Sequence, residues 1–419
     1  MIARFCAYAV LRNLRFFDAF LILFLLLELK ISYLELGALL AYEKILGGVL
    51  EIPLGIFADK VGRRISLSAA FVILAVACVL FVAAAHVPQT LICLYVAQTF
   101  LGLSEALRSG THKAMILDWL SGEGRSDEAT QVMSLTRFFS KSTEGVAALL
   151  AGVIVFLTDA FSPLLWLTIA PALANAALIA SYPKALEGDL RRAGAGKAKK
   201  KRKAPKGPLI ERLKALRAHF GGGALVALIF MSVFFESQIK LSMRYLQPYL
   251  EQGLGALDLT AQAGAGALIF GAYHFIKGLL AGGSAFLANR LPRWLGGPQR
   301  ALQGVYLWAT AAMALTALGL WLGWAPLGFA MMLALAALQN ARRPLFVATL
   351  DGYMDKRWRT TTLSVESQLR QWAYALTALG TGALAEWGGL PWAFALMAAI
   401  MIIGAAAGLA LRQTQPREA

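Results

Sequence analysis

The stretch Gly55-Ile-Phe-Ala-Asp59-Lys-Val-Gly62-Arg63-Arg64 separates two long apolar runs, residues 36–54 and 65–85. Its glycines predict a tight turn, and a short turn between two helices makes them antiparallel neighbours. Three of its ten residues are basic and one is acidic. Because basic loops stay on the cytoplasmic side of a membrane, the stretch predicts a cytoplasmic hairpin between two membrane-spanning helices.

The composition excludes an ordinary soluble domain. Of the 419 residues 58% are hydrophobic, and the mean hydropathy is +0.61, whereas soluble domains are about 45–50% apolar. The apolar residues form continuous runs of about 20 residues, the length of a membrane-spanning helix, and lack the alternation of a transmembrane β-barrel. The sequence predicts an all-α membrane protein with twelve transmembrane helices, at residues 8–28, 35–54, 65–85, 90–118, 132–157, 163–182, 222–249, 262–287, 300–321, 325–349, 362–386 and 391–411.

A basic segment divides these spans six and six. We predict an N-terminal half at 1–183, a basic cytoplasmic linker at 184–220 and a C-terminal half at 221–419. The linker has thirteen Lys and Arg against three Asp and Glu, which supplies ten of the sixteen net positive charges of the chain. The positive-inside rule accounts for this charge as a linker that faces anionic lipid headgroups, so we expect no nucleic-acid partner.

The short loops predict the orientation of the chain. Loops placed inside carry Lys or Arg, and loops placed outside carry none except for Lys30. Both termini are therefore expected in the cytoplasm of a multi-pass inner or plasma membrane protein. The three cysteines, Cys6, Cys78 and Cys93, have no C-x-x-C spacing. We accordingly expect no disulfide, no metal site and no cofactor.

Many charged residues fall inside the predicted spans, where a charge normally faces a partner or a water-filled cavity. Several step by three or four along the chain, so that they share one helix face. A part of them is explained equally well as structural ion pairs, and Arg342 and Arg343 as residues that snorkel to the cytoplasmic surface. The central ones are the candidates for substrate binding and proton coupling: Asp18, Glu43, Glu105, Arg108, Lys141, Glu144, Glu236, Lys240 and Arg370.

The order Gly-x-x-x-Asp-x-x-Gly-Arg-Arg resembles the signature loop between helices 2 and 3 of the major facilitator superfamily. The resemblance implies a secondary transporter with two pseudo-symmetric six-helix halves that rock around a central site. It also implies that the loop latches the halves in one state, with Arg63 reaching a carboxylate at the end of span 4, where Asp118 lies. The residues of this conformational latch are Gly55, Asp59, Gly62, Arg63, Arg64 and Asp118.

The resemblance does not extend to the drug/proton antiporters of the family. Those members carry an arginine in span 4, four residues before a glycine, whereas Gln98 precedes Gly102 here. The Gly-Pro pair of their span 5 is also missing. The sequence contains no H-E-x-x-H, no G-x-S-x-G and no P-loop, so that neither an enzyme nor an ATP-driven pump is predicted.

We predict a monomeric secondary active transporter that moves a small organic solute by alternating access. The cationic surplus among the intramembrane charges favours an anionic or zwitterionic solute. Coupling to protons would use one of four carboxylates (Glu43, Glu105, Glu144 or Glu236), and the chain would act as an exporter. A lipid or amphiphile flippase and a drug-type efflux carrier stay open as alternatives, as does a non-transporting membrane sensor or assembly partner.

Overall fold

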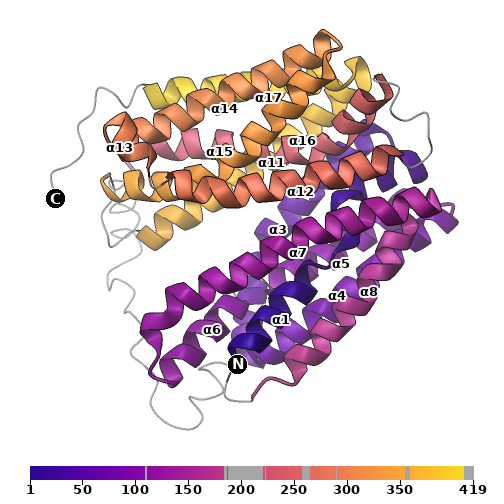
Figure 1. Cartoon of the computed structure of the whole chain (residues 1–419), viewed down its shortest axis with the longest axis vertical. Coiled ribbons are helices and arrows are strands. Elements are labelled where there is room, and N and C mark those ends of the chain that lie inside the picture. Colours follow the sequence, from indigo (N-terminus) through magenta and orange to yellow (C-terminus); the bar gives the residue numbers. More distant parts are fainter. Residues whose placement is uncertain are drawn as a thin grey trace. The chain divides into compact units, whose positions relative to one another are not determined.

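The computed structural model describes residues 1–108, 111–183, 186, 220–221, 223–256, 265–288, 290–353 and 359–409. Within these ranges the regular structure is helical, and no β-strand occurs. Helices satisfy their own backbone hydrogen bonds, which a segment inside the bilayer has to do. The prediction of an all-α chain is confirmed (Figure 1).

Each of the twelve predicted spans coincides with helical structure. The first span corresponds to α1 (Ile2–Asn13), η1 (Phe16–Ala19), α2 (Leu21–Leu23) and the π-helical turn η2 (Phe24–Glu28). The others correspond, in order, to α3 (Tyr33–Val61), α4 (Arg63–Ala83), α5 (Thr90–Arg108) with α6 (Thr111–Gly122), α7 (Ala129–Thr158), α8 (Ser162–Ala180), α11 (Gly223–Ala256), α12 (Ala265–Ala288), α14 (Pro298–Trp321), α15 (Ala325–Asp351), α16 (Arg359–Gly388) and α17 (Leu390–Leu409). Short helical connections are η3 (Ala84–His86), η4 (Ser126–Glu128) and α13 (Leu291–Leu295).

Among the described residues, six helical segments are long and apolar enough to cross a membrane by length and composition alone: Arg63–His86, Thr90–Gly122, Ser126–Thr158, Ser162–Ala180, Gly223–Gly255 and Pro298–Trp321. Two shorter apolar helices are Gly266–Leu280 and Leu390–Ala406. Helices α3, α15 and α16 have 29, 27 and 30 residues, and each carries several charged residues within its length. These charges are the ones that need an explanation in the folded chain.

The first span is broken, where the sequence predicts one continuous helix over 8–28. Leu14 and Arg15 leave the helical conformation, with ψ angles of 54° and 83°. Non-helical backbone at membrane depth persists only where protein buries it or where it lines a water-filled cavity. The break therefore gives Arg15 surroundings that a regular helix position would not have.

The turn of the signature stretch is shorter than predicted. Residues 55–61 continue α3, so Gly62 alone separates α3 from α4. Gly62 has a φ of +116°, a conformation that glycine adopts without the steric cost of a Cβ. Its carbonyl accepts the first hydrogen bond of α4, from Ser66 N at 3.0 Å. A single glycine thus reverses the chain direction.

The described chain forms two compact units. Unit 1 comprises Met1–Ser32, Tyr42–Lys199 and Asp258–Gly278, and unit 2 comprises Tyr33–Ala41, Lys200–Leu257 and Leu279–Ala419. The division into halves at 1–183 and 221–419 stays a prediction. The predicted linker 184–220 lies outside the described residues, apart from Leu186 and Phe220.

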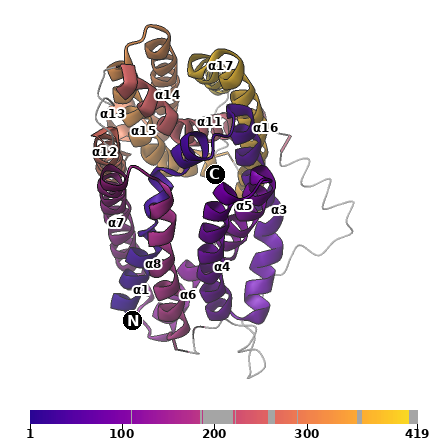
Figure 2. The ribbon, with the colours of Figure 1, turned by 90° about the vertical axis from the view of Figure 1, so that its right-hand side faces the viewer.

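In unit 1, helix α4 packs against α5 and α8, and α1 packs against α7 and α8 (Figure 2). The beginning of α12 lies across α7 with backbone in close approach. A Cβ added at Gly152 would come within 2.5 Å of the Ala267 carbonyl oxygen, and one at Gly271 within 2.8 Å of the Ala148 carbonyl oxygen. Glycine on both helices makes this crossing sterically feasible.

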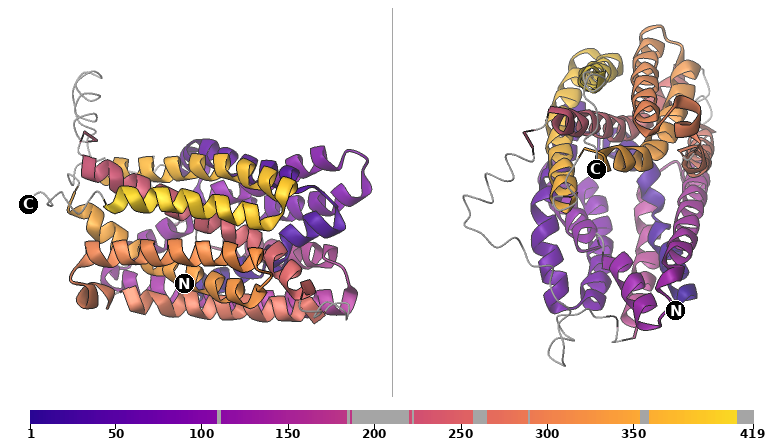
Figure 3. Two further views of the ribbon diagram at one scale, coloured as in Figure 1. Left: turned by 90° about the horizontal axis from the view of Figure 1, so that it is seen from above. Right: turned by 90° about the vertical axis from the view of Figure 1, so that its left-hand side faces the viewer.

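In unit 2, helix α14 packs against α15 and α17, and α11 packs against α15, α16 and α17 (Figure 3). The first residues of α3 are held on α16. A Cβ added at Gly37 would lie 3.0 Å from the Gly382 Cα, and the Glu386 carboxylate accepts a hydrogen bond from Tyr33 N at 2.8 Å. A carboxylate at a helix N-terminus also interacts favourably with the helix dipole.

We expect Gly152→Ala to lower the free energy of unfolding by about 1–3 kcal/mol, the usual cost of overpacking a tight contact. The added methyl would collide with the backbone at Ala267, which cannot rotate away. The control is Gly278→Ala on α12, where nothing in the described chain lies within 4 Å of the new methyl. Unfolding of both variants in detergent measures the difference, and equal stability would contradict the crossing.

Candidate functional site

A cluster of four charged residues in unit 1, here the N-terminal ion cluster, joins the first span to α5. It consists of Arg15, Asp18, Glu105 and Arg108. Arg15 and Arg108 both donate hydrogen bonds to Glu105, and Arg15 pairs with Asp18 at 3.0 Å. Arg15 reaches this position from the break in the first span, and Glu105 and Arg108 lie one turn apart at the end of α5.

The acids and the bases of this cluster differ in exposure. The side chains of Arg15 and Arg108 are 15% and 13% exposed, whereas those of Asp18 and Glu105 are 48% and 40% exposed. The guanidinium groups are thus largely enclosed while the carboxylates that neutralise them remain open to exchange with solvent. Three of these residues, Asp18, Glu105 and Arg108, are sequence-based candidates, and the structure brings them together.

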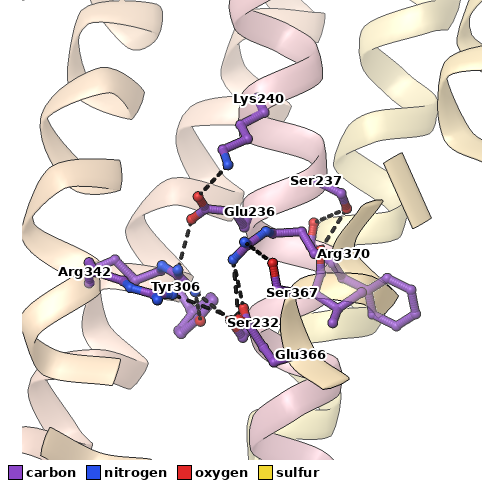
Figure 4. Close-up of polar contacts among 12 residues, drawn as sticks. Ser232, Glu236, Ser237, Lys240, Tyr306, Arg342, Glu366, Ser367 and Arg370 are labelled. Carbon is purple, nitrogen blue, oxygen red and sulfur yellow. Dashed lines mark hydrogen bonds and ion pairs between the residues drawn. The ribbon is translucent and has the colours of Figure 1, made fainter. Parts of the chain in front are cut away.

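A second group in unit 2, here the C-terminal ion cluster, joins α11, α15 and α16 (Figure 4). On α11, Glu236 pairs with Lys240 at 3.1 Å and with Arg342 of α15 at 2.8 Å. On α16, Glu366 accepts hydrogen bonds from Arg370 at 3.0 and 3.2 Å. The residues of the cluster are Ser232, Glu236, Lys240, Tyr306, Arg342, Arg343, Glu366, Ser367 and Arg370.

Arg342 is the centre of this cluster. Its side chain is fully buried, and besides the Glu236 pair it donates to Ser232 Oγ at 2.6 Å and to Tyr306 Oη at 3.3 Å. The explanation of Arg342 as a snorkelling residue is therefore wrong. For its neighbour Arg343, whose side chain is 52% exposed and contacts Glu366 at 3.7 Å, the explanation stays a prediction.

Sequence reasoning named Glu236, Lys240 and Arg370 but left out Arg342 and Glu366, which the structure places between them. Ser232 connects the two halves of the network, because it donates to Glu366 at 2.7 Å while it accepts from Arg342. The four-residue step from Glu366 to Arg370 was the available signal. Arg342 lies near the predicted end of its span, and for this reason the sequence did not indicate that its side chain is buried.

The remaining sequence-based candidates pair locally. Lys141 and Glu144 on α7 form a pair at 2.6 Å with side chains that are 45% and 54% exposed. Glu43 contacts the adjacent Lys44 on α3 at 2.5 Å. A site for a metal ion would need several His, Cys, Asp or Glu together, and no group of three or more is found in the part of the chain that the structure describes.

The structure shows contacts for some of the predicted latch residues and not for others. Arg63 contacts Asp118 at 2.5 Å, so the expected ion pair is present. Arg64 donates to the Tyr182 carbonyl at 2.8 Å, and Gly62 makes the turn. Gly55 lies inside α3 with no described atom within 4 Å of an added Cβ, while the Asp59 side chain lies outside the described part of the structure. The role of these residues as a latch stays a prediction.

Arg342→Ala should lower the free energy of unfolding by about 3–5 kcal/mol, since it removes the buried partner of Glu236. The matched control is Arg343→Ala, which removes a half-exposed arginine from the next position and should cost less than about 1 kcal/mol. Denaturant unfolding of the purified variants measures both values. Similar losses from the two variants would contradict the central place of Arg342.

The Arg63–Asp118 pair is partly exposed, with side chains 18% and 41% accessible. A double-mutant cycle of Arg63→Gln and Asp118→Asn should therefore give a coupling free energy for unfolding of about 0.2–1 kcal/mol. Transport by either single variant should fall further than this small loss of stability explains, if the pair latches a conformational state. Unchanged transport in a stable Asp118→Asn variant would leave the pair a structural contact only.

The comparisons with known proteins agree with this fold. The family model of the Major Facilitator Superfamily matches residues 1–372. Solved structures similar to the chain include a mutant of the nucleoside transporter NupG (TM-score 0.75, 13% identity, 98% of each chain covered). Another is a bacterial homologue of the iron transporter ferroportin in the inward-facing state (TM-score 0.72, 12% identity, 98% of this chain and 97% of that chain covered). A third is the xylose transporter XylE from E. coli (TM-score 0.68, 16% identity, 99% of this chain and 97% of that chain covered).

No curated protein matches the sequence. At these low identities the solved structures establish the fold alone, while the family match covers most of the chain. The expectation raised by the signature stretch is therefore confirmed at the level of family and fold, and the chain is a transporter and not an enzyme. This multi-pass, all-α membrane protein belongs to the major facilitator superfamily.

Proposed function

We propose that this chain is a secondary active transporter for a small organic anion or zwitterion, driven by protons. The observation that supports this substrate class is the charge of the C-terminal ion cluster. Four cations, Lys240, Arg342, Arg343 and Arg370, share two carboxylates, Glu236 and Glu366. The cluster thus carries a surplus of two positive charges. In an apolar bundle such a surplus attracts an anion and disfavours a cationic solute.

Proton coupling is assigned to Glu105 among the four carboxylates that the sequence left open. A coupling group has to exchange protons with water, and the side chains of Glu105 and Glu144 are 40% and 54% exposed, compared with 12% for Glu236 and 18% for Glu43. Of the two exposed carboxylates, Glu144 is paired with a single lysine on its own helix. Glu105 holds two arginines, Arg15 and Arg108. Protonation would remove its charge and release the guanidinium group of Arg108, while Arg15 would keep its pair with Asp18. The released donors could then bind the oxygens of an anionic solute.

This mechanism has a consequence for the direction of transport. A proton that binds to Glu105 makes room for the anion, so that proton and anion bind together and cross together. Such coupling is symport, and with an inward proton gradient it favours uptake. Of the two directions, we therefore propose import, in place of the export expected from the sequence.

The remaining features of the proposal are those of the family. The two six-helix halves would alternate access to a site near the midplane, with both termini in the cytoplasm because the basic loops lie on that side. The Arg63–Asp118 pair would stabilise one of the two states. The basic linker would contact anionic headgroups, and one copy of the chain would suffice for transport.

Proteoliposomes with a pH-sensitive dye inside test the coupling, with organic anions, zwitterions and cations supplied outside. In the wild type, an anion should acidify the lumen as it enters. Glu105→Gln mimics the protonated carboxylate and should abolish anion-driven proton entry while it leaves exchange of solute for solute. Glu144→Gln, which removes an exposed carboxylate paired with Lys141, is the matched control and should leave proton entry unchanged.

Four other results would count against the proposal. Solute entry without acidification would disprove proton coupling, and alkalinisation would indicate antiport. Acidification evoked by cations alone would disprove the substrate class. If labelled lipid were flipped while every soluble solute stayed outside, the chain would be a flippase.

A further inference from the structure

Arg12 is a partly buried cation on α1, three residues before Arg15. Unlike Arg15, Arg108 or Arg342, it forms no ion pair and no hydrogen bond with any residue that the structure describes. Arg12 lies one helical turn after Tyr8 on α1, so the two side chains share one helix face. The charges of Arg108, Glu105 and Arg15 also act on it. Arg12 therefore adds a third arginine to the N-terminal ion cluster without adding a carboxylate.

Two aromatic residues extend this group toward the interior of unit 1. The rings of Tyr8 and His112 stack with their centroids 3.5 Å apart and their planes 12° apart. Both residues are buried, with 2% and 7% of their surface exposed. The buried Oη of Tyr8 and the buried Nε2 of His112 have no hydrogen-bond partner within the described ranges. Because most buried polar atoms have a hydrogen-bond partner, these atoms call for an explanation.

The chemistry of the group is that of an anion site. Three guanidinium groups lie near one another, and like charges at short range repel unless an anion intervenes. Glu105 already accepts hydrogen bonds from Arg15 and Arg108, so it does not complete the surroundings of Arg12. The planar guanidinium matches the two oxygens of a carboxylate or phosphate. The phenol of Tyr8 and the imidazole of His112 could each donate a further hydrogen bond.

We propose that Arg12, together with Tyr8 and His112, binds the oxyanion group, a carboxylate or a phosphate, of the transported solute. The proposal rests on the proposed function and makes it more specific, because it assigns the charged end of the solute to unit 1. Binding of the solute supplies the missing acceptor oxygens and neutralises the third arginine.

The site can be tested without knowledge of the physiological solute. Benzoate and inorganic phosphate serve as probe anions and tetraethylammonium as the cationic control, added to the purified full-length protein in uncharged detergent. Affinity is read from the shift in thermal unfolding with probe concentration. We expect benzoate, phosphate or both to stabilise the wild type. Arg12→Gln should raise the Kd of the bound anion at least about tenfold, since the lost hydrogen bonds involve a charged group.

Two further variants separate binding from folding and from net charge. Arg12→Lys keeps the charge but lacks the fork of two parallel donors, so it should fold like the wild type and bind the anion more weakly. Lys113→Gln removes an exposed cation from the residue next to His112 and should leave affinity unchanged. Wild-type affinity in both Arg12→Lys and Arg12→Gln would overturn the proposal, as would a wild type that neither anion stabilises.

An anionic lipid headgroup offers the same oxygens as a solute, and nanodiscs distinguish the two sources. If Arg12→Gln changed only the extra stability given by anionic over zwitterionic lipid, the solute site would be disproved. Transport separates this inference from the proposed function. An anion that enters proteoliposomes with the same KM in wild type and Arg12→Gln would overturn the inference alone. Anion binding at Arg12 without transport would support the site and overturn the function.

Discussion

A charge inside an apolar helix bundle requires a counter-charge, and this constraint shapes both units. An unpaired charge at the bilayer centre costs about 2.5–3.5 kcal/mol on insertion scales. Arg342 meets the constraint with Glu236 of another helix, and its Nη1 donates to both Ser232 and Tyr306. The rings of Phe235 and Phe346 lie 5.6 and 5.1 Å from its guanidinium carbon. One buried side chain thereby fixes α11, α14 and α15 relative to one another. Ser232 extends the network to α16, because it donates a hydrogen bond to Glu366.

The two ion clusters use equivalent helices with opposite charges. In unit 1 the first span supplies the central arginine, Arg15, and the fourth supplies Glu105. In unit 2 the corresponding seventh span supplies the carboxylate, Glu236, and the tenth supplies the central arginine, Arg342. The carboxylates of the N-terminal ion cluster are 40% and 48% exposed, whereas those of the C-terminal ion cluster are 12% and 0% exposed. The first arrangement suits the proton exchange that we propose for Glu105, and the second suits the proposed attraction of an anion.

The sequence was sufficient for the fold because hydropathy is a local property. Runs of about 20 apolar residues and a basic glycine turn predict spans and hairpins without any knowledge of tertiary contacts. The Arg63–Asp118 pair was predictable for another reason, since the signature stretch specifies one partner and the end of span 4 offers the other. The break after Asn13 was not predictable, because residues 8–28 are apolar enough for one continuous helix and contain neither glycine nor proline. The burial of individual charges could not be predicted from the sequence either. Arg342 and Arg343 are adjacent and chemically identical, yet Arg342 is fully buried and Arg343 is half exposed. The reason is that consecutive helix positions point about 100° apart.

The break in the first span explains why Arg12 and Arg15 differ. In a continuous helix, residues three apart lie on one face, so both arginines would compete for the same carboxylate. Because the chain leaves the helical path at Leu14 and Arg15, the two side chains start from different backbone directions. Arg15 pairs with Glu105 and Asp18, and Arg12 stays in α1 beside Tyr8. The same backbone feature that completes one ion pair therefore leaves the neighbouring arginine without an ion pair among the described residues.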